Sequence, residues 1–142
     1  MNAPLYTTEI LRLAASLPEP RRLDPVGGMS EQRSPTCGST VRVEVRLDGS
    51  GRIEAVSQQV HACAFGQASA ALMEAGARGR SREDVARTVA EIEDWLGGVR
   101  DDPGGWPAFV ALAPARTRRS RHGAILLPFR ALLAAMTPPA DA

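Results

Sequence analysis

The stretch from His61 to Met73 constrains the fold of this chain more than any other. It joins a strand-like pattern to an alanine-rich helical pattern, and it holds one of the two cysteines and one of the two histidines. The cysteine, Cys63, falls at the junction, where the N–H groups at the start of a helix point outward and the helix dipole favours a thiolate. The sequence therefore predicts a functional thiol at the N-terminal end of this helix.

A β-hairpin is predicted immediately before this junction. Apolar and polar residues alternate over 41–47, the turn residues 48–51 follow, and a second strand pattern runs over 52–60. The alternation changes parity between Ile53 and Val56, which predicts a β-bulge. The region 21–40 is rich in Pro, Gly and Ser and shows no period, so we expect it to form a loop.

Helical patterns occupy the rest of the chain. A helix over 64–76, ending near Gly76 or Gly79, would follow the hairpin, and Pro128 would kink the last helix or delay its start. The other expected elements are a short helix capped by Thr7 or Thr8, a helix capped by Ser81 with Val85, Val89, Ile92 and Leu96 on one face, and a brief helix over 109–113. The expected fold class is α+β, a small antiparallel sheet covered by helices.

Size and charge limit the classes of function. A chain of 142 residues is expected to form a single domain over 1–142, with frayed tails at 1–4 and 137–142. The net charge of +1 and the aromatic fraction of 4% argue against nucleic-acid binding. We find neither a signal-peptide pattern nor an apolar stretch of membrane-spanning length, so we expect no membrane association and a cytoplasmic protein. In that compartment, two cysteines serve as thiols or metal ligands more often than as a disulfide.

Four side chains are candidate metal ligands. Cys37 lies just before the hairpin and Cys63 just after it, so both can reach the same end of the sheet. His61 is two residues before Cys63, which places both on one face if the strand continues. His122 follows the basic run 116–121 and opens the last helix. Two Cys and two His suit tetrahedral zinc or iron, although their spacing is not that of a zinc finger.

Each candidate also has an alternative without chemistry. Either cysteine can pack as a small hydrophobic residue, and either histidine can be a hydrogen-bonded or solvated surface group. The sequence contains no nucleophile elbow, P-loop or dinucleotide fingerprint, so we assign no catalytic residue and do not expect an enzyme.

Three short motifs resemble those of the NifU-like iron–sulfur cluster assembly scaffold family, which includes the IscU and SufU types. That family has a Cys-Gly-Asp turn before its first long strand, a Gly-Cys pair before an Ala/Ser-rich helix, and a third Cys that opens a late helix. The matching segments here are Cys37-Gly38-Ser39, Ala62-Cys63-Ala64 with Ala68-Ser69-Ala70 behind it, and Arg121-His122 after Pro114-Ala115-Arg116. Ser39 replaces the family's Asp, and His122 is the best replacement for its third Cys. The resemblance runs from about Leu5 to Leu133.

The resemblance implies a SufE/NifU-like fold and a scaffold or delivery function. Cys37, Cys63 and His122 would hold an iron–sulfur cluster or its iron or zinc precursor, with Ser39 or His61 completing the ligand set. The implied partners are a cysteine desulfurase and apo acceptor proteins, and the chain would be a monomer or weak dimer. Independently of the resemblance, the basic run 116–121 could dock an acidic surface. Two alternatives stay open: a diverged zinc-binding or metal-free binding module, and a zinc-dependent sulfur acceptor that uses Cys63.

Overall fold

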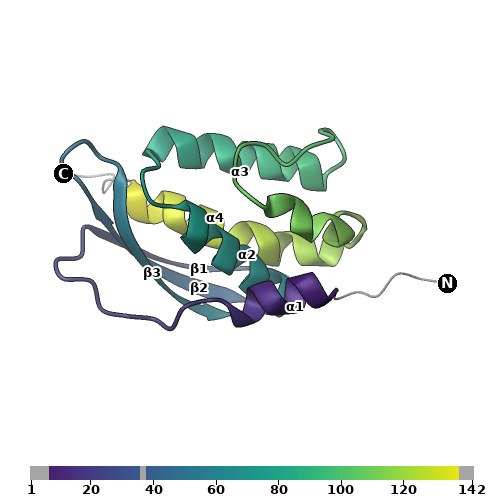
Figure 1. Ribbon diagram of the computed structural model, residues 1–142, viewed down its shortest axis with the longest axis horizontal. Coiled ribbons are helices and arrows are strands. Elements are labelled where there is room, and N and C mark those ends of the chain that lie inside the picture. Colours follow the sequence, from purple (N-terminus) through teal and green to yellow (C-terminus); the bar gives the residue numbers. More distant parts are fainter. Residues whose placement is uncertain (1–6, 36–37, 138–142) are drawn as a thin grey trace.

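A three-stranded antiparallel sheet forms one layer of the protein, and helices cover one of its faces (Figure 1). The structure, a computed structural model, describes residues 7–35 and 38–137. The strands are β1 (Gly28–Arg33), β2 (Thr40–Leu47) and β3 (Ile53–His61), arranged in the order β1-β2-β3. The helices are α1 (Thr8–Ala15), α2 (Ala64–Gly76), α3 (Arg82–Leu96) and α4 (His122–Met136), with 3-10 helices η1 (Phe109–Thr117) and η2 (Arg119–Arg121) before α4. The predicted α+β class is confirmed.

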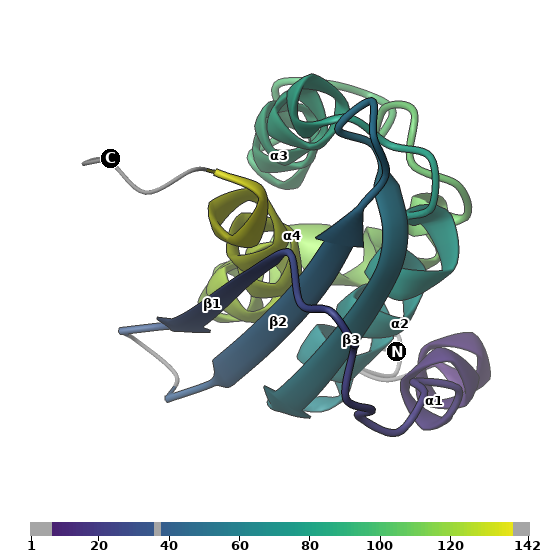
Figure 2. The same ribbon diagram turned by 90° about the vertical axis from the view of Figure 1, so that its left-hand side faces the viewer.

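The layers follow from the alternation in β2. Val41, Val43 and Val45 are buried on the face that packs against α4, while the intervening polar residues lie on the opposite face. Helix α2 packs beside β3, and α3 packs on α4 away from the sheet. The segment between α1 and β1 crosses the other face of the sheet (Figure 2).

The hairpin and its bulge are confirmed. Strands β2 and β3 pair in antiparallel register, with Arg46 opposite Ala55 and Leu47 opposite Ile53. This register leaves Glu54 as an extra residue on β3, which is the arrangement of a β-bulge. The turn is closed by Asp48, whose Oδ1 accepts hydrogen bonds from the N–H groups of Ser50 (2.8 Å) and Arg52 (3.0 Å).

The expectation that 21–40 forms only loop, ordered or flexible, is wrong at one place, because residues 28–33 form strand β1. This strand pairs with β2 from Gly28 opposite Val45 to Arg33 opposite Thr40. Its inward position is filled by Ser30, a polar residue that is buried. Since no apolar side chain marks the buried face, the alternation on which strand prediction depends is missing.

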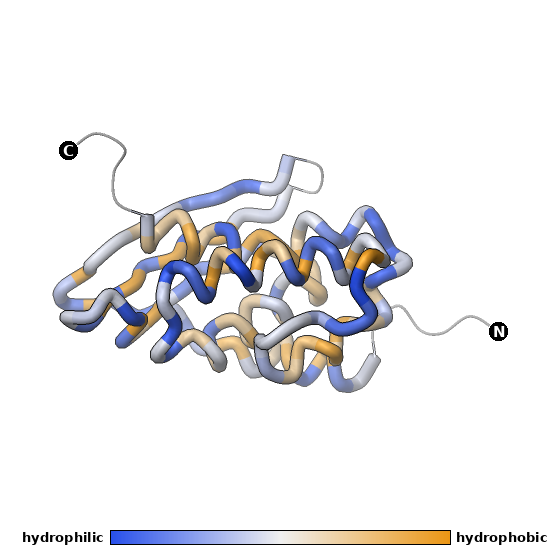
Figure 3. Tube along the Cα trace, turned by 90° about the horizontal axis from the view of Figure 1, so that it is seen from above, coloured by the Kyte–Doolittle hydropathy of each residue, from blue (hydrophilic) through white to orange (hydrophobic). Residues whose placement is uncertain are grey.

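The predicted helices are present, with small differences in extent. Thr7 caps α1 by accepting the Ile10 N–H at 3.1 Å, and α2 begins and ends as predicted. Ser81 forms a capping box with Asp84 at the start of α3, whose hydrophilic and hydrophobic positions alternate along its length (Figure 3). The brief helix expected over 109–113 extends to Thr117 as η1. Helix α4 begins at His122 and includes Pro128, so a late start is excluded.

Edge-to-face contacts between aromatic side chains connect the elements of the helical layer. Trp106 and Phe109 each lie edge-to-face against Phe129, with ring centroids 5.1 and 5.5 Å apart, and Phe109 meets Trp95 in the same way at 5.8 Å. The Trp106 Nε1–H donates to the Leu72 carbonyl at 2.8 Å, which ties this cluster to α2. Among the residues that the structure describes, we find no helix of the length and apolarity that a membrane span needs.

Candidate functional site

Helices α2 and α4 begin at the same end of the molecule, and this end holds the candidate site (Figure 1). Their first turns are in close contact, since a Cβ added to Gly66 would lie 3.4 Å from the Ala124 Cβ. The Ser69 hydroxyl also donates to the Ile125 carbonyl at 2.6 Å. Small residues on α2 therefore allow α4 to approach it closely, and this brings the start of one helix beside the start of the other.

Cys63 is the N-cap residue of α2. Its backbone is extended (φ −65°, ψ 174°), its side chain caps no N–H group, and its thiol is partly exposed. The first turn of α2 contains no acidic residue. The thiol therefore lies beside unpaired N–H groups at the positive end of the helix dipole, a location that favours an anionic ligand.

His61 does not share a strand face with Cys63, so that expectation is wrong. Strand β3 ends at His61, and the chain has turned into the N-cap of α2 by Cys63. Because the two-residue repeat of a strand stops at His61, it cannot align the two side chains. His61 is exposed and pairs with Thr40 across the sheet.

His122 is the first residue of α4, as predicted, and its ring is held by the backbone. Its Nε2 lies 2.9 Å from the Ala115 carbonyl oxygen and 3.1 Å from that of Arg116. A carbonyl only accepts, so Nε2 carries a hydrogen and donates it, and the lone pair of the neutral form of this ring would be on Nδ1. Histidines that bind metals are commonly oriented by such a hydrogen bond to a backbone carbonyl.

The ring of His122 also lines a surface cavity of about 390 Å³. The other lining residues come from the end of α3, from η1 and from η2, namely Leu96, Gly97, Gly98, Arg116, Thr117 and Arg119. Cys63 is not among them. The two helix starts are therefore neighbours, but the cavity opens on the α3 side of His122.

Cys37 lies outside the described residues, and the residues beside it form the turn between β1 and β2. The Ser34 N–H donates to the Ser39 carbonyl at 2.9 Å, and Gly38 adopts a φ of +72° that favours glycine. Ser39 is only 5% exposed. Because Thr40 pairs with His61, this turn comes to the end of β3 from which the chain enters α2. The flank of Cys37 and the flank of Cys63 thus meet at one end of the sheet.

Within residues 7–35 and 38–137, no group of three His, Cys, Asp or Glu side chains is placed to hold a metal ion. A site that used Cys63 and His122 would have one donor from each of two neighbouring helix starts. A third ligand would have to come from elsewhere, and Cys37 is the cysteine outside those ranges.

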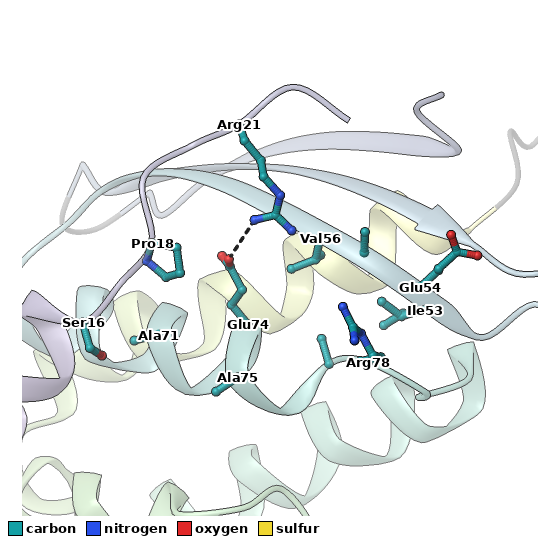
Figure 4. A pocket seen from close by; sticks show the side chains of 12 residues that line it. Ser16, Pro18, Arg21, Ile53, Glu54, Val56, Ala71, Glu74, Ala75 and Arg78 are labelled. Atoms are coloured by element: carbon teal, nitrogen blue, oxygen red, sulfur yellow. Dashed lines mark ion pairs between the residues drawn. The ribbon is translucent and has the colours of Figure 1, made fainter. Parts of the chain in front are cut away.

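A second cavity, of about 270 Å³, lies between α2 and β3 and is separate from this site (Figure 4). Arg21 Nη1 lies 3.6 Å from Glu74 Oε2 at its edge, and the Gln58 amide donates to Glu74 Oε1 at 3.1 Å. Burial raises the pKa of Glu74, while the Gln58 hydrogen bond and the Arg21 charge act in the opposite direction. We did not predict this group, although its signal is visible as one acid within the apolar run of α2.

Comparison with known proteins identifies the family. A sequence model of the NifU-like N terminal domain matches residues 6–105, so this chain belongs to the NifU-like N-terminal domain family. A NifU-like protein (N-terminal) from Brucella abortus is 26% identical, with a TM-score of 0.84 over 93% of this chain and 92% of that one. A putative iron–sulfur cluster assembly scaffold protein for the SUF system from Fervidobacterium islandicum AW-1 is 20% identical, with a TM-score of 0.84 over 94% of this chain and 97% of that one. No curated protein sequence matches.

The sequence match and the structural match cover different parts of the candidate site. Residues 6–105 include Cys37 and Cys63, so both cysteines fall within the family's sequence pattern. His122 lies beyond that range, in the part of the chain that only the structural matches cover. The family match therefore covers the stretch of the chain that contains both cysteines and does not extend to the histidine.

Proposed function

We propose that this protein carries an iron–sulfur cluster, or the iron that precedes it, as cargo for delivery to apo acceptor proteins. The observation that carries the proposal is the meeting of two helix starts, α2 with Cys63 at its N-cap and α4 with His122 as its first residue. Membership of the NifU-like family supports the same class of function. In this proposal the protein is a scaffold and not an enzyme, and a cysteine desulfurase supplies the sulfur.

The donor chemistry of the proposed ligands fits this cargo. Thiolates of Cys37 and Cys63 suit iron and cluster irons, and a neutral imidazole in place of a third thiolate makes the site less negative. The hydrogen bonds from His122 Nε2 to two backbone carbonyls orient the ring and leave Nδ1 for the metal. His61 or Ser39 would complete the ligand set. A partly exposed Cys63 also keeps the cargo accessible to an acceptor.

The direct test is the metal and sulfide content of protein purified without air, together with its visible absorption spectrum. Iron with acid-labile sulfide is the expected result. Zinc alone would move the assignment to a zinc-dependent sulfur acceptor or a structural zinc site, and absence of any bound metal would leave a metal-free binding module. Either of these results would overturn the cargo proposal.

Four single variants assign the ligands. We expect the bound iron to fall severalfold in each of Cys37→Ser, Cys63→Ser and His122→Ala. Circular dichroism of the same samples should show that each variant stays folded. His61→Ala tests the other histidine, which is exposed at the end of β3 and which at most completes the ligand set, so it should lower the bound iron less than His122→Ala does. If His61→Ala removes the iron and His122→Ala does not, the histidine assignment is wrong.

A second candidate function is favoured by the place of Cys63, which is partly exposed and packs against the core at a helix start without a side-chain cap, a location where reactive cysteines occur. The Cys63 thiol would take the outer sulfur of a partner's persulfide, forming a persulfide on Cys63 and returning the partner's thiol. In the Cys37→Ser background, Cys63 should then react with iodoacetamide at about pH 7. A Cys63 that reacts only above about pH 8 would exclude this function.

A further inference from the structure

Charge is segregated along this chain. Residues 103–140 contain five of the 17 arginines and none of the 16 acidic residues, so this segment carries +5 and the remainder −4. The segment 55–73, which forms most of β3 and the start of α2, also contains no acidic residue. The near-neutral total charge of +1 therefore hides a basic part of the sequence.

The fold gathers three of these arginines at the start of α4. Arg118, Arg119 and Arg121 lie in and beside η2, the first two exposed and the third half-buried. Their guanidinium groups form no ion pair or hydrogen bond with any residue in the described ranges. We refer to these three residues as the η2 arginine cluster.

The neighbouring arginine has a different role. Arg116 Nε donates to the Trp95 carbonyl at 2.8 Å, its Nη2 donates to the Arg100 carbonyl at 2.9 Å, and its guanidinium lies 5.2 Å from the Trp95 ring centroid. These contacts anchor the cluster's backbone to the end of α3. Structural arginines are thus distinguishable from unpaired ones within the same basic run.

The surroundings reinforce the positive charge. The first turns of α2 and α4 meet here, and neither has an acidic residue or a side-chain cap. Two carboxylates of α3 are paired with other arginines, Glu93 with Arg130 at 2.8 Å and Glu91 with Arg100 at 3.7 Å, whereas Asp94 and Asp101 form no ion pair with a described residue. None of these carboxylates forms an ion pair with the cluster, and the helix dipoles add to its positive field.

We infer that the η2 arginine cluster is the docking surface for an acidic face of a partner protein, beside the end of the molecule that holds Cys63 and His122. Guanidinium groups pair with carboxylates through two parallel hydrogen bonds, and a basic patch steers an acidic partner toward it. Nucleic acid fits this surface less well, because every Trp and Phe side chain is buried and none is available for base stacking. The inference of docking depends on these charges alone, whereas a role of the docking in cargo transfer rests on the proposed function.

The test uses a labelled peptide of alternating glutamate and alanine as the probe of an acidic protein surface. A single-stranded DNA oligonucleotide of similar length serves as the probe of nucleic-acid binding. Both are titrated into the full chain at about 50 mM and at about 200 mM salt, because rim contacts between charges are screened by salt. Amide chemical shifts are followed by NMR. The peptide is expected to perturb η2 and the first turn of α4 and to bind more weakly at the higher salt concentration.

Two triple charge reversals separate a specific surface from total charge. The first variant combines Arg118→Glu, Arg119→Glu and Arg121→Glu, and it should bind the peptide about tenfold more weakly. The control reverses three exposed arginines that also lack ion pairs with described residues, Arg22, Arg33 and Arg78, and should change binding by less than about twofold.

Each alternative outcome overturns the inference. Equal losses in both triple variants would show that only net charge matters, and tighter binding of the oligonucleotide than of the peptide would assign the surface to nucleic acid.

Iron content is measured on the same samples. An arginine variant that keeps its iron and loses the peptide supports the docking surface, whereas a wild-type protein that binds peptide without binding iron contradicts the cargo proposal alone.

Discussion

Glu74 is the acid in α2, and its carboxylate is held in a largely apolar setting. Its side chain is 11% exposed, and its nearest cation, Arg21, is 3.6 Å away. Burial raises the pKa of Glu74 above its ordinary value of 4.5. The folded protein therefore binds the Glu74 carboxyl proton more tightly than the unfolded chain does. The stability gained from this proton is fully present below about pH 4.5, and it is lost as the pH rises through the higher pKa of the folded state.

Replacing Glu74 by Gln should remove this pH dependence. We expect Glu74→Gln to be more stable than wild type at about pH 7, by no more than about 1 kcal/mol because the ion pair with Arg21 is lost. The advantage should shrink on acidification toward about pH 4. The measurement is the free energy of unfolding in urea at both pH values.

The control for this prediction is Glu19→Gln, at an exposed position between α1 and β1. It should match wild type at both pH values. A Glu74→Gln protein that is equally destabilised at both pH values would show that the carboxylate is needed for its contacts with Gln58 and Arg21, and that the cost of its burial is small.

Residue-level prediction from sequence succeeded where the local pattern itself decides the structure. Cys63 was placed at the start of α2 because the change from a strand pattern to an alanine-rich helix is local. His122 was placed at the start of α4 for a similar reason. The hydrogen bonds of its ring to the carbonyls of 115 and 116 were not predictable, since they depend on how η1 folds back on the helix start.

Among the elements, β1 shows what sequence patterns cannot predict. Its residues are Gly-Met-Ser-Glu-Gln-Arg, and neither its hydrophobicity nor its propensity marks a strand. It forms because β2 offers a paired edge and α4 covers its inner face. Tertiary contacts therefore decide this element, while β2, α2 and α3 follow their own periodicity.

The contact of β1 with α4 gives a prediction at Gly28. A Cβ at this position would collide with the backbone carbonyl oxygen of Ala135, an atom that cannot move without shifting the helix. We expect Gly28→Ala to destabilise the protein by about 1–3 kcal/mol, the range for overpacking a close contact. Urea unfolding gives the magnitude, and faster hydrogen exchange of the β1 amides shows that the loss is local to this strand.

Gly49→Ala is the matched control. Nothing lies within 4 Å of a Cβ placed there, and its φ is outside the left-handed region. This substitution should be neutral or slightly stabilising, because alanine restricts the unfolded chain more than glycine does. Similar losses in both variants would mean that the loss at Gly28 does not come from the clash with Ala135.

At the scale of the whole molecule, the proposed ligands come from three separate parts of the chain. Cys37 belongs to the connection between β1 and β2, Cys63 to the start of α2, and His122 to the start of α4. An ion bound by all three would connect the sheet to both helices that cover it. Such an ion binds only the folded chain, so it must raise the stability of the entire fold.

Zinc provides the probe for this linkage, because it accepts the same thiolate and imidazole ligands without redox chemistry. At zinc concentrations about 100 times the dissociation constant, stabilisation of about 2.7 kcal/mol is expected, or roughly 5–10 °C in the unfolding temperature. Chelation should reverse the shift, and magnesium, which prefers oxygen ligands, should produce none. In the proposed site all three side chains hold one ion, so Cys37→Ser, Cys63→Ser and His122→Ala should each reduce the shift. A His122→Ala protein with the full zinc shift would remove α4 from the site and leave the cysteines to bind with His61 or Ser39, whereas a full shift in Cys37→Ser would show that the connection between β1 and β2 does not reach the metal.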